Sequence, residues 1–252
     1  MLWLLDLDGV VWLTGRPIPG SADAVARLRS AGDRVAFLTN NSGPTLDEYV
    51  KMLGDAGIEA EAGEMVTSAN AAASMLAPGS TAAVVGDAGI DEALAEQGVE
   101  VVRAADGPDA VVVGRSVALD YNELAAAATA IRAGARFVAT NADATFPTPD
   151  GLLPGAGAMV AFLQAASGRE PEVAGKPNQP VADLVASRYG HVDVVVGDRP
   201  DTDGRFAHLV GSRFVLVLTG VTSKSDLPVE PEPDTVSDDL AAAVSTLLEP
   251  PP

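Results

Sequence analysis

Two aspartates near the start of the chain, Asp6 and Asp8, have the type and the spacing of residues that carry out chemistry. They follow the apolar run Leu2–Leu5, which predicts a short buried parallel strand, and Gly9 behind them lets the chain turn tightly. Open α/β sheets bind their ligands beyond the carboxyl ends of the strands, where this pair would lie. Read alone, the pair fits a capped turn as well as it fits a reactive site. The residues that follow the later strands distinguish a reactive site from a capped turn.

Later segments place further polar residues at the ends of predicted strands or helices. Thr39, Asn40 and Asn41 follow the strand predicted over 34–38. Lys176 precedes a helix that ends near residue 188. Asp198 and Asp203 follow the strand predicted over 192–196. Carboxylates brought together repel one another, by roughly 4 kcal/mol for two unit charges about 4 Å apart at an effective dielectric of 20. Such a cluster requires a cation, and ligands that are all oxygen atoms suit Mg²⁺.

These groups together predict phosphoryl chemistry. Asp6 can attack phosphorus as a carboxylate nucleophile, while Asp8 protonates the leaving oxygen and later takes a proton from the attacking water. Hydrogen-bond donors and positive charge for the phosphate oxygens come from one hydroxyl, two backbone N–H groups and one ammonium group, those of Thr39, Asn40, Asn41 and Lys176. This local positive charge is needed because the chain carries a formal net charge of -19.

The elements that must position these residues alternate between strand and helix along the chain. The alternation predicts an α/β fold, with a Rossmann-like, doubly wound parallel-sheet core and an inserted α/β cap domain. The predicted limits are 1–78 and 175–252 for the core and 79–174 for the insert. Inside the insert, residues 140–157 are predicted to form a long polar loop that ends in a glycine-rich turn. The last strand is predicted over 214–218, and Ser237 is predicted to cap a final helix.

Composition excludes several classes of partner. With 35 acidic and 16 basic residues, the chain lacks the positive charge that a nucleic-acid backbone or an anionic membrane surface would require. It has no cysteine, which excludes disulfides and thiolate metal sites. No apolar run approaches the roughly 18 to 20 residues of a membrane span. The first residues enter a strand without a hydrophobic signal segment, so we expect a cytoplasmic protein without nucleic-acid or membrane partners.

Four segments carry a family resemblance, in the order DLDGVVW, FLTNNS, AGKP and GDRPDTD. They resemble the four motifs of the haloacid-dehalogenase superfamily of phosphohydrolases. The insert lies between the second and the third segment and includes ATNADATFPTPDGLLPGAG. In this it is similar to the large α/β cap of the branch that contains 4-nitrophenyl phosphatases, phosphoglycolate and glycerol-phosphate phosphatases, and ribonucleotide monophosphatases. The resemblance covers residues 2 to about 222.

The resemblance implies a Mg²⁺-dependent phosphatase that forms an aspartyl phosphate. It implies Asp6 as the nucleophile and Asp8 as the general acid and base. The Mg²⁺ ion would be held by the Asp6 carboxylate, the backbone carbonyl of Asp8 and Asp198. Asp203 would have a supporting place near the metal, and Trp12 would belong to a flap beside the entrance.

The resemblance also implies how the substrate is bound. Thr39 and Lys176 would contact the phosphate, and Asn40 would contribute through its backbone. The cap residues Asn141 and Asp143 would approach the leaving group. Caps of this type often mediate dimers in the family, which makes a homodimer through the cap one expected assembly.

The sequence departs from the family pattern in places. Pro200 and Gly204 stand in the fourth motif where bulkier aliphatic residues are usual, and Gly204 weakens the helix start that should hold Asp203. Arg199 is expected to pair with a carboxylate of the same motif. In the cap, Ser116 stands where an acidic residue is expected, so contacts of the cap with the substrate would differ.

Two other functions stay open at this point. One is a receiver-like signalling domain that accepts phosphate on an aspartate, and the other is a catalytically idle binding protein on the same fold. A receiver has no use for a second carboxylate two residues after the first, and an idle protein would be favoured by a missing carboxylate. We therefore expect a phosphomonoesterase for small-molecule phosphate esters, because a large cap closes off macromolecules and selects the alcohol.

Overall fold

The computed structural model describes residues 1–148 and 151–248. The chain forms two compact units, which we treat separately. The core unit comprises Met1–Thr39, Asp47–Val66 and the chain from Val185 onward, and the cap unit comprises Asn40–Leu46 and Thr67–Leu184. The limits 79–174 predicted for the insert stay a proposal.

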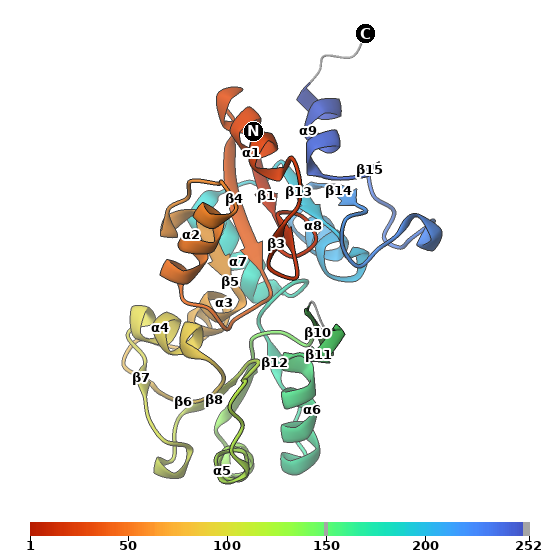
Figure 1. Ribbon diagram of the computed structural model, residues 1–252. Helices are drawn as coiled ribbons and strands as arrows, with labels where there is room; N and C mark the ends of the chain where they lie inside the picture. Colours follow the sequence, from red (N-terminus) through yellow and green to blue (C-terminus); the bar gives the residue numbers. More distant parts are fainter. Residues whose placement is uncertain (149–150, 249–252) are drawn as a thin grey trace. The chain divides into compact units, whose positions relative to one another are not determined.

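The core unit is built on a six-stranded sheet, whose strands are β1 (Leu2–Leu5), β4 (Arg34–Thr39), β5 (Met65–Thr67), β13 (Val194–Gly197), β14 (Arg213–Val217) and β15 (Thr235–Ser237). Their order is β15-β14-β13-β1-β4-β5 (Figure 1). β1 pairs in parallel with β13 on one side and with β4 on the other. β4 and β5 therefore extend the sheet on one side of β1, and β13, β14 and β15 extend it on the other side. The direction in which the strands are added reverses between β1 and β13. This reversal is the point where doubly wound sheets bind ligands.

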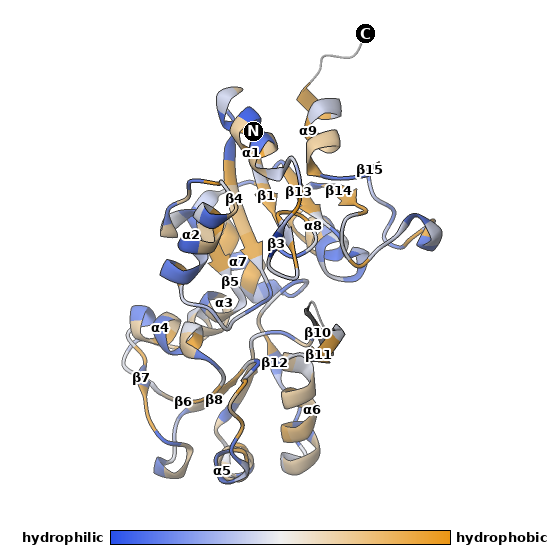
Figure 2. Cartoon of the chain, viewed as in Figure 1, coloured by the Kyte–Doolittle hydropathy of each residue, from blue (hydrophilic) through white to orange (hydrophobic). Residues whose placement is uncertain are grey.

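Side-chain composition explains why these segments form the centre of the sheet. All four residues of β1 and all four of β13 are buried, and valine supplies three residues of β13. β-Branched side chains pack well on a pleated surface, and strands covered on both faces are apolar throughout. Figure 2 shows these strands in the hydrophobic colours, whereas α2 is largely hydrophilic. The helices that lie wholly or partly in the core unit are α1 (Ser21–Ser30), α2 (Leu46–Asp55), α7 (Gln179–Tyr189), α8 (Arg205–Val210) and α9 (Leu240–Leu248).

The cap unit contains a five-stranded sheet of order β12-β9-β8-β6-β7, formed by β6 (Thr81–Val85), β7 (Glu100–Val101), β8 (Ala110–Val113), β9 (Arg136–Ala139) and β12 (Glu172–Val173). The helices of this unit are α3 (Ser68–Ser74), α4 (Ala88–Gln97), α5 (Tyr121–Ala133) and α6 (Ala156–Ser167). Small alanines of α5 and the buried Leu163 of α6 pack on the valines of β8. The predicted fold class, an α/β core with a capping α/β domain, is confirmed.

Two segments differ from the prediction. The loop predicted over 140–157 contains an antiparallel hairpin of β10 (Thr145–Thr148) and β11 (Gly151–Pro154). β15 follows the strand that was predicted to be the last, and it includes Ser237. The prediction that Ser237 caps the final helix is therefore wrong. The Asp239 side chain accepts a hydrogen bond from the Ala242 N–H at 2.7 Å and caps the N-terminus of α9 instead.

Across residues 1–148 and 151–248, no helix has both the length and the apolar character that a membrane crossing requires.

Candidate active site

A cluster of three carboxylates lies at the carboxyl edge of the core sheet. Asp6 follows β1, Asp198 follows β13, and Asp203 lies in the π-helical turn Pro200–Gly204 behind β13. Each side chain offers an oxygen atom, and the three oxygens lie within 4.8 Å of one another. Asp198 is 2% exposed and Asp203 is fully buried. The core thus brings together three of the four predicted metal ligands at the reversal point of the strand order.

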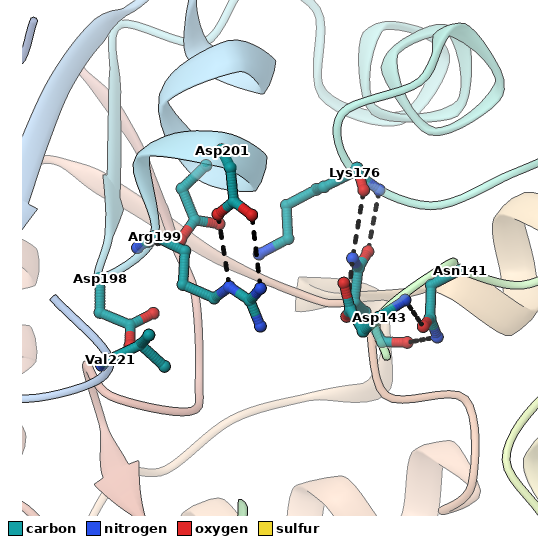
Figure 3. A network of polar contacts seen from close by, with 9 residues as sticks. Asn141, Asp143, Lys176, Asp198, Arg199, Asp201 and Val221 are labelled. Carbon is teal, nitrogen blue, oxygen red and sulfur yellow. Dashed lines mark hydrogen bonds and ion pairs between the residues drawn. The ribbon is translucent and has the colours of Figure 1, made fainter. Parts of the chain in front are cut away.

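Glycines leave the space that the buried Asp198 carboxylate occupies. A side chain on Gly9 would begin 2.5 Å from the Asp198 carboxyl group, and one on Gly220 would begin 1.9 Å from its Oδ2. The same oxygen accepts a hydrogen bond of 2.5 Å from the Val221 N–H (Figure 3). Because the carboxylate is enclosed by backbone on two sides, its position is fixed by parts of the chain far from it in sequence.

Asp203 is held from within its own turn. Its Oδ2 accepts a hydrogen bond of 3.1 Å from the Arg199 N–H, and a side chain on Gly197 would begin 2.2 Å from the Asp203 carboxyl group. The Arg199 guanidinium pairs with Asp201 at 3.4 Å, as expected for a carboxylate of this motif. A π-helical turn is rare and often lies at a functional site.

The structure also explains the unusual Gly204 of the fourth motif. A side chain at this position would begin 2.8 Å from the Phe214 ring and 2.9 Å from Pro231. Phe214 is fully buried, so its ring has no room to move away. Gly204 therefore allows Phe214 and Pro231 to pack closely against the turn that holds Asp203.

Asp8 lies in the turn that leads from β1 into the short hairpin of β2 (Trp12–Leu13) and β3 (Arg16–Pro17). Gly9 adopts φ of 82°, a conformation that disfavours other residues. Its N–H donates to the Trp12 carbonyl at 2.6 Å, and Asp8 forms an isolated bridge with Trp12. These contacts fix the backbone around Asp8, while its side chain is half-buried.

The loop after β14 supplies residues that the sequence reasoning missed. The Thr219 hydroxyl donates a hydrogen bond of 2.5 Å to the Gly9 carbonyl, and Gly220 and Val221 enclose Asp198. A signal was present, because Thr219 comes two residues after a buried strand, as Asp6 comes one residue after its own. This loop joins the turn of the predicted nucleophile to a predicted metal ligand.

Thr219→Val is expected to lower kcat by about 3- to 10-fold, since it leaves the half-buried Gly9 carbonyl without its donor. Thr219→Ser keeps the hydroxyl and should retain most of the activity. Steady-state turnover of 4-nitrophenyl phosphate by the three proteins measures the effect. Equal losses in both variants would show that the threonine methyl group, and not the hydrogen bond, matters.

A second cluster of predicted site residues lies in the cap unit, around Asn40. Its side-chain amide pairs with the Lys176 peptide in both directions: Oδ1 accepts from the Lys176 N–H at 2.8 Å, and Nδ2 donates to the Lys176 carbonyl at 3.1 Å (Figure 3). Gly175 makes this approach possible, because a side chain there would begin 2.6 Å from Asn40 Oδ1. Lys176 itself is 4% exposed. The sequence predicted a role for the Asn40 backbone, whereas this pairing shows that its side chain positions Lys176.

The predicted cap residues also converge on Asn40. Asn141 Nδ2 donates to the Asn40 carbonyl at 2.6 Å, and Asp143 Oδ2 accepts from Asn40 Nδ2 at 3.2 Å. Asn41 Oδ1 accepts from the Gly43 N–H at 3.1 Å, which closes a short turn. Thr39 is buried at the last position of β4, in the core unit. The predicted residues therefore form two groups, one in each unit.

The carboxylate cluster fits a hard divalent cation. Three oxygen ligands from Asp6, Asp198 and Asp203 lie close together, and two of the three side chains are buried. Carboxylates in this arrangement repel one another strongly unless a cation lies among them. All three ligand atoms are oxygen, which suits Mg²⁺. Zinc sites in proteins usually contain nitrogen or sulfur ligands, and this cluster has neither.

Comparison with known proteins agrees with this geometry. Residues 3–100 match the family described as haloacid dehalogenase-like hydrolase, and residues 173–243 match a second family description, HAD-hydrolase-like. The chain is 43% identical over 229 residues to D-glycerol 3-phosphate phosphatase of Mycobacterium tuberculosis, a match that covers 88% of this chain and 64% of that protein. It is 34% identical over 252 residues to acid sugar phosphatase of Staphylococcus haemolyticus, covering 97% of this chain and 95% of that protein.

A solved structure is similar as well. The glycerol phosphate phosphatase of Mycobacterium tuberculosis in complex with magnesium has a TM-score of 0.89 and 40% identity, covering 96% of this chain and 75% of that one. The chain therefore belongs to the haloacid-dehalogenase-like hydrolases, among the phosphatases that carry an inserted cap. It spans 64% of the length of the Mycobacterium tuberculosis relative, so substrate and partners do not carry over from that protein directly.

Proposed function

We propose that this protein is a Mg²⁺-dependent phosphomonoesterase that hydrolyses small phosphorylated metabolites through an aspartyl phosphate on Asp6. The observation that carries the proposal is the convergence of Asp6 with Asp198 and Asp203 at the reversal point of the core sheet. A binding protein on this fold would not need a nucleophile within a group of buried carboxylates. The names of the relatives, which are phosphatases of glycerol phosphate and acid sugars, support the same class.

We assign the metal to Asp6, Asp198 and Asp203, with the backbone carbonyl of Asp8 as a further ligand. When bound, Mg²⁺ would neutralise the cluster and the incoming phosphate dianion. The magnesium complex of the Mycobacterium tuberculosis phosphatase supports this choice of ion.

The chain's own residues perform the proton and phosphoryl steps in this proposal. Asp6 attacks phosphorus and the ester oxygen leaves as an alcohol, which takes its proton from Asp8. Asp8 then accepts a proton from the water that attacks the aspartyl phosphate, and the carboxylate of Asp6 is restored. Thr39 and the backbone of Asn40 and Asn41 donate hydrogen bonds to the phosphate.

The ammonium group of Lys176 completes the proposed phosphate contacts. Asn40 orients Lys176 by pairing with its peptide, and Asn141 and Asp143 in turn hold Asn40. We also propose that Asn141 and Asp143 contact the leaving group of the substrate directly. This role would add to the hydrogen bonds that both residues make to Asn40.

The proposal also covers the partners, the assembly and the location of the protein. The substrate is a small phosphate ester, and neither a nucleic acid nor a membrane is expected as a partner, in agreement with the net charge of -19. A homodimer through the cap and a cytoplasmic location are parts of the proposal. Sedimentation of the purified protein and fractionation of cells that express it test these two points.

The proposal is tested by measuring phosphate release from a panel of esters that includes 4-nitrophenyl phosphate, glycerol 3-phosphate, 2-phosphoglycolate and sugar phosphates. Release should require Mg²⁺, stop in EDTA and return when Mg²⁺ is restored. A folded protein that releases phosphate from no ester would contradict the proposal. Labelling of Asp6 by acetyl phosphate would then favour the receiver-like function, and no labelling would favour an idle binding protein.

A further inference from the structure

A pocket of about 450 Å³ lies at the amino edge of the core sheet, at the end of β1 opposite to Asp6. The first residue of β1, Leu2, and the first three of β4, Arg34, Val35 and Ala36, line it. The remaining lining residues come from the ends of α1 and α7 and from the chain just before β5, and all of them belong to the core unit. The volume is in the range of small-molecule sites. We call this cavity the amino-edge pocket.

The amino-edge pocket has apolar residues and an aromatic side chain in its lining. Leu2, Val35 and Ala36 are at most 5% exposed. The Tyr189 hydroxyl donates a hydrogen bond of 2.8 Å to the Gly63 carbonyl, which holds the ring in place. Burial raises the pKa of Tyr189, so the phenol keeps its proton and this hydrogen bond at neutral pH. The lining therefore offers a fixed surface to the apolar part of a small molecule.

Most charged groups of the pocket already have partners within the core unit. Arg29 donates to both oxygens of the Glu64 carboxylate, at 2.9 and 3.0 Å. The Asp33 carboxylate accepts from the Met1 ammonium at 2.6 Å and from the Trp3 indole N–H at 3.0 Å. A ligand gains little from such groups, because it must first replace the bonds that they make.

Arg34 differs from the other charged groups of the lining. Its side chain is exposed, and its guanidinium forms neither a hydrogen bond nor an ion pair with any residue within 1–148 or 151–248. A guanidinium offers five N–H donors in a planar fork that fits the two oxygens of a carboxylate. Three acidic and two basic side chains line the pocket, so a dianion would be repelled more strongly than a monoanion. Arg34 therefore selects a singly charged oxyanion.

We propose that the amino-edge pocket binds a small organic carboxylate, which pairs with Arg34 and places its apolar part against Tyr189 and Val35. This inference goes beyond the proposed phosphatase function and does not depend on it. The four residues of β1, at about 3.3 Å each, separate the pocket from Asp6 by roughly 13 Å. The carboxylate is therefore a second ligand and not the substrate.

The experiment is a titration of ¹⁵N-labelled protein, followed by NMR, with benzoate, benzamide and phenylphosphonate. Benzoate should shift the Arg34 Nε–H signal and the backbone N–H signals of Val35 and Ala36 in a saturable way. Benzamide has the same ring without the charge, so we expect it to bind at least about 10-fold more weakly. Phenylphosphonate carries a second negative charge and should also bind more weakly than benzoate. Tighter binding of either of these two probes would overturn the assignment to a carboxylate.

Two substitutions of Arg34 and one matched control test which group binds the carboxylate. Arg34→Met should weaken benzoate binding by about 10- to 100-fold, because hydrogen bonds to a charged group are lost. Arg34→Lys keeps the charge without the planar fork and should give an intermediate loss. Arg16 is another exposed arginine of the core unit whose guanidinium has no hydrogen bond or ion pair within the described residues. Arg16→Met should change binding by less than about 2-fold.

Thermal unfolding of each variant shows whether the fold is intact. No shift of Val35 and Ala36 with benzoate, or equal binding by the wild-type protein and Arg34→Met, would overturn the site. An equal loss in Arg16→Met would show a general attraction of anions and would overturn it as well. Asp6→Asn should bind benzoate like the wild-type protein, so a failure of the phosphatase proposal is distinguished from a failure of this one.

Discussion

Asp6→Asn is expected to lower phosphate release by about 10⁴-fold or more, because the amide has the shape of the carboxylate but not its nucleophilic oxygen. The loss should appear in kcat for every ester of the panel, since all of them share the phosphoryl step. Phosphate release over hours, measured with a large excess of enzyme, is sensitive enough to detect the residual rate. Intact-mass analysis of quenched reactions should find a phosphorylated wild-type chain and an unmodified variant.

Asp6 is also a proposed metal ligand, so the two roles must be separated. Raising Mg²⁺ would restore activity if the residue were only a ligand, whereas a lost nucleophile cannot be restored in this way. Asp23→Asn is the matched control, because Asp23 is an exposed carboxylate of the core unit in the first turn of α1. Full turnover by Asp6→Asn at saturating Mg²⁺ would rule out the aspartyl phosphate.

Gly220→Ala is expected to weaken activation by Mg²⁺ by about 10- to 100-fold, the range found when groups that orient a metal ligand are changed. The added methyl carbon would lie 1.9 Å from Asp198 Oδ2, a distance that no real contact reaches, so the carboxylate must move. The movement would also break its hydrogen bond from the Val221 N–H. Titration of activity against Mg²⁺ gives the change directly.

Gly54→Ala is the control for the Gly220 experiment. Gly54 lies in α2, and a side chain there would meet no atom within 4 Å. In a helix interior alanine is more stable than glycine by up to about 1 kcal/mol, so this variant should unfold at a slightly higher temperature with unchanged Mg²⁺ dependence. Normal Mg²⁺ activation in Gly220→Ala would show that Asp198 has another position from which it can bind the ion.

Residues that lie at strand ends could be predicted from the sequence because the signal is local. An apolar run followed by aspartates marks both β1 with Asp6 and β13 with Asp198, and the carboxyl ends of parallel strands meet at one edge. Fold class and the three clustered carboxylates therefore followed from short segments of chain.

The contacts that hold those residues could not be predicted, because they join distant segments. The bond from Thr219 to the Gly9 carbonyl spans 210 positions, and the pairing of Asn40 with Lys176 spans 136. The hairpin of β10 and β11 was missed because its two prolines and its polar residues are typical of loops. The buried Arg115 Nε, which has no hydrogen-bond partner within residues 1–148 and 151–248, can be recognised only when the side chains around it are placed.

The strand order also determines when the reactive edge can form during synthesis. β1 leads directly to Asp6, the proposed nucleophile, whereas its neighbour β13 follows about 190 residues later, with Trp3 beside Val194. A ribosome-bound chain that has not reached β13 therefore contains Asp6 without the two buried carboxylates that accompany it. The group of three carboxylates to which we assign the cation can therefore form only after β13 and the turn that follows it have been synthesised.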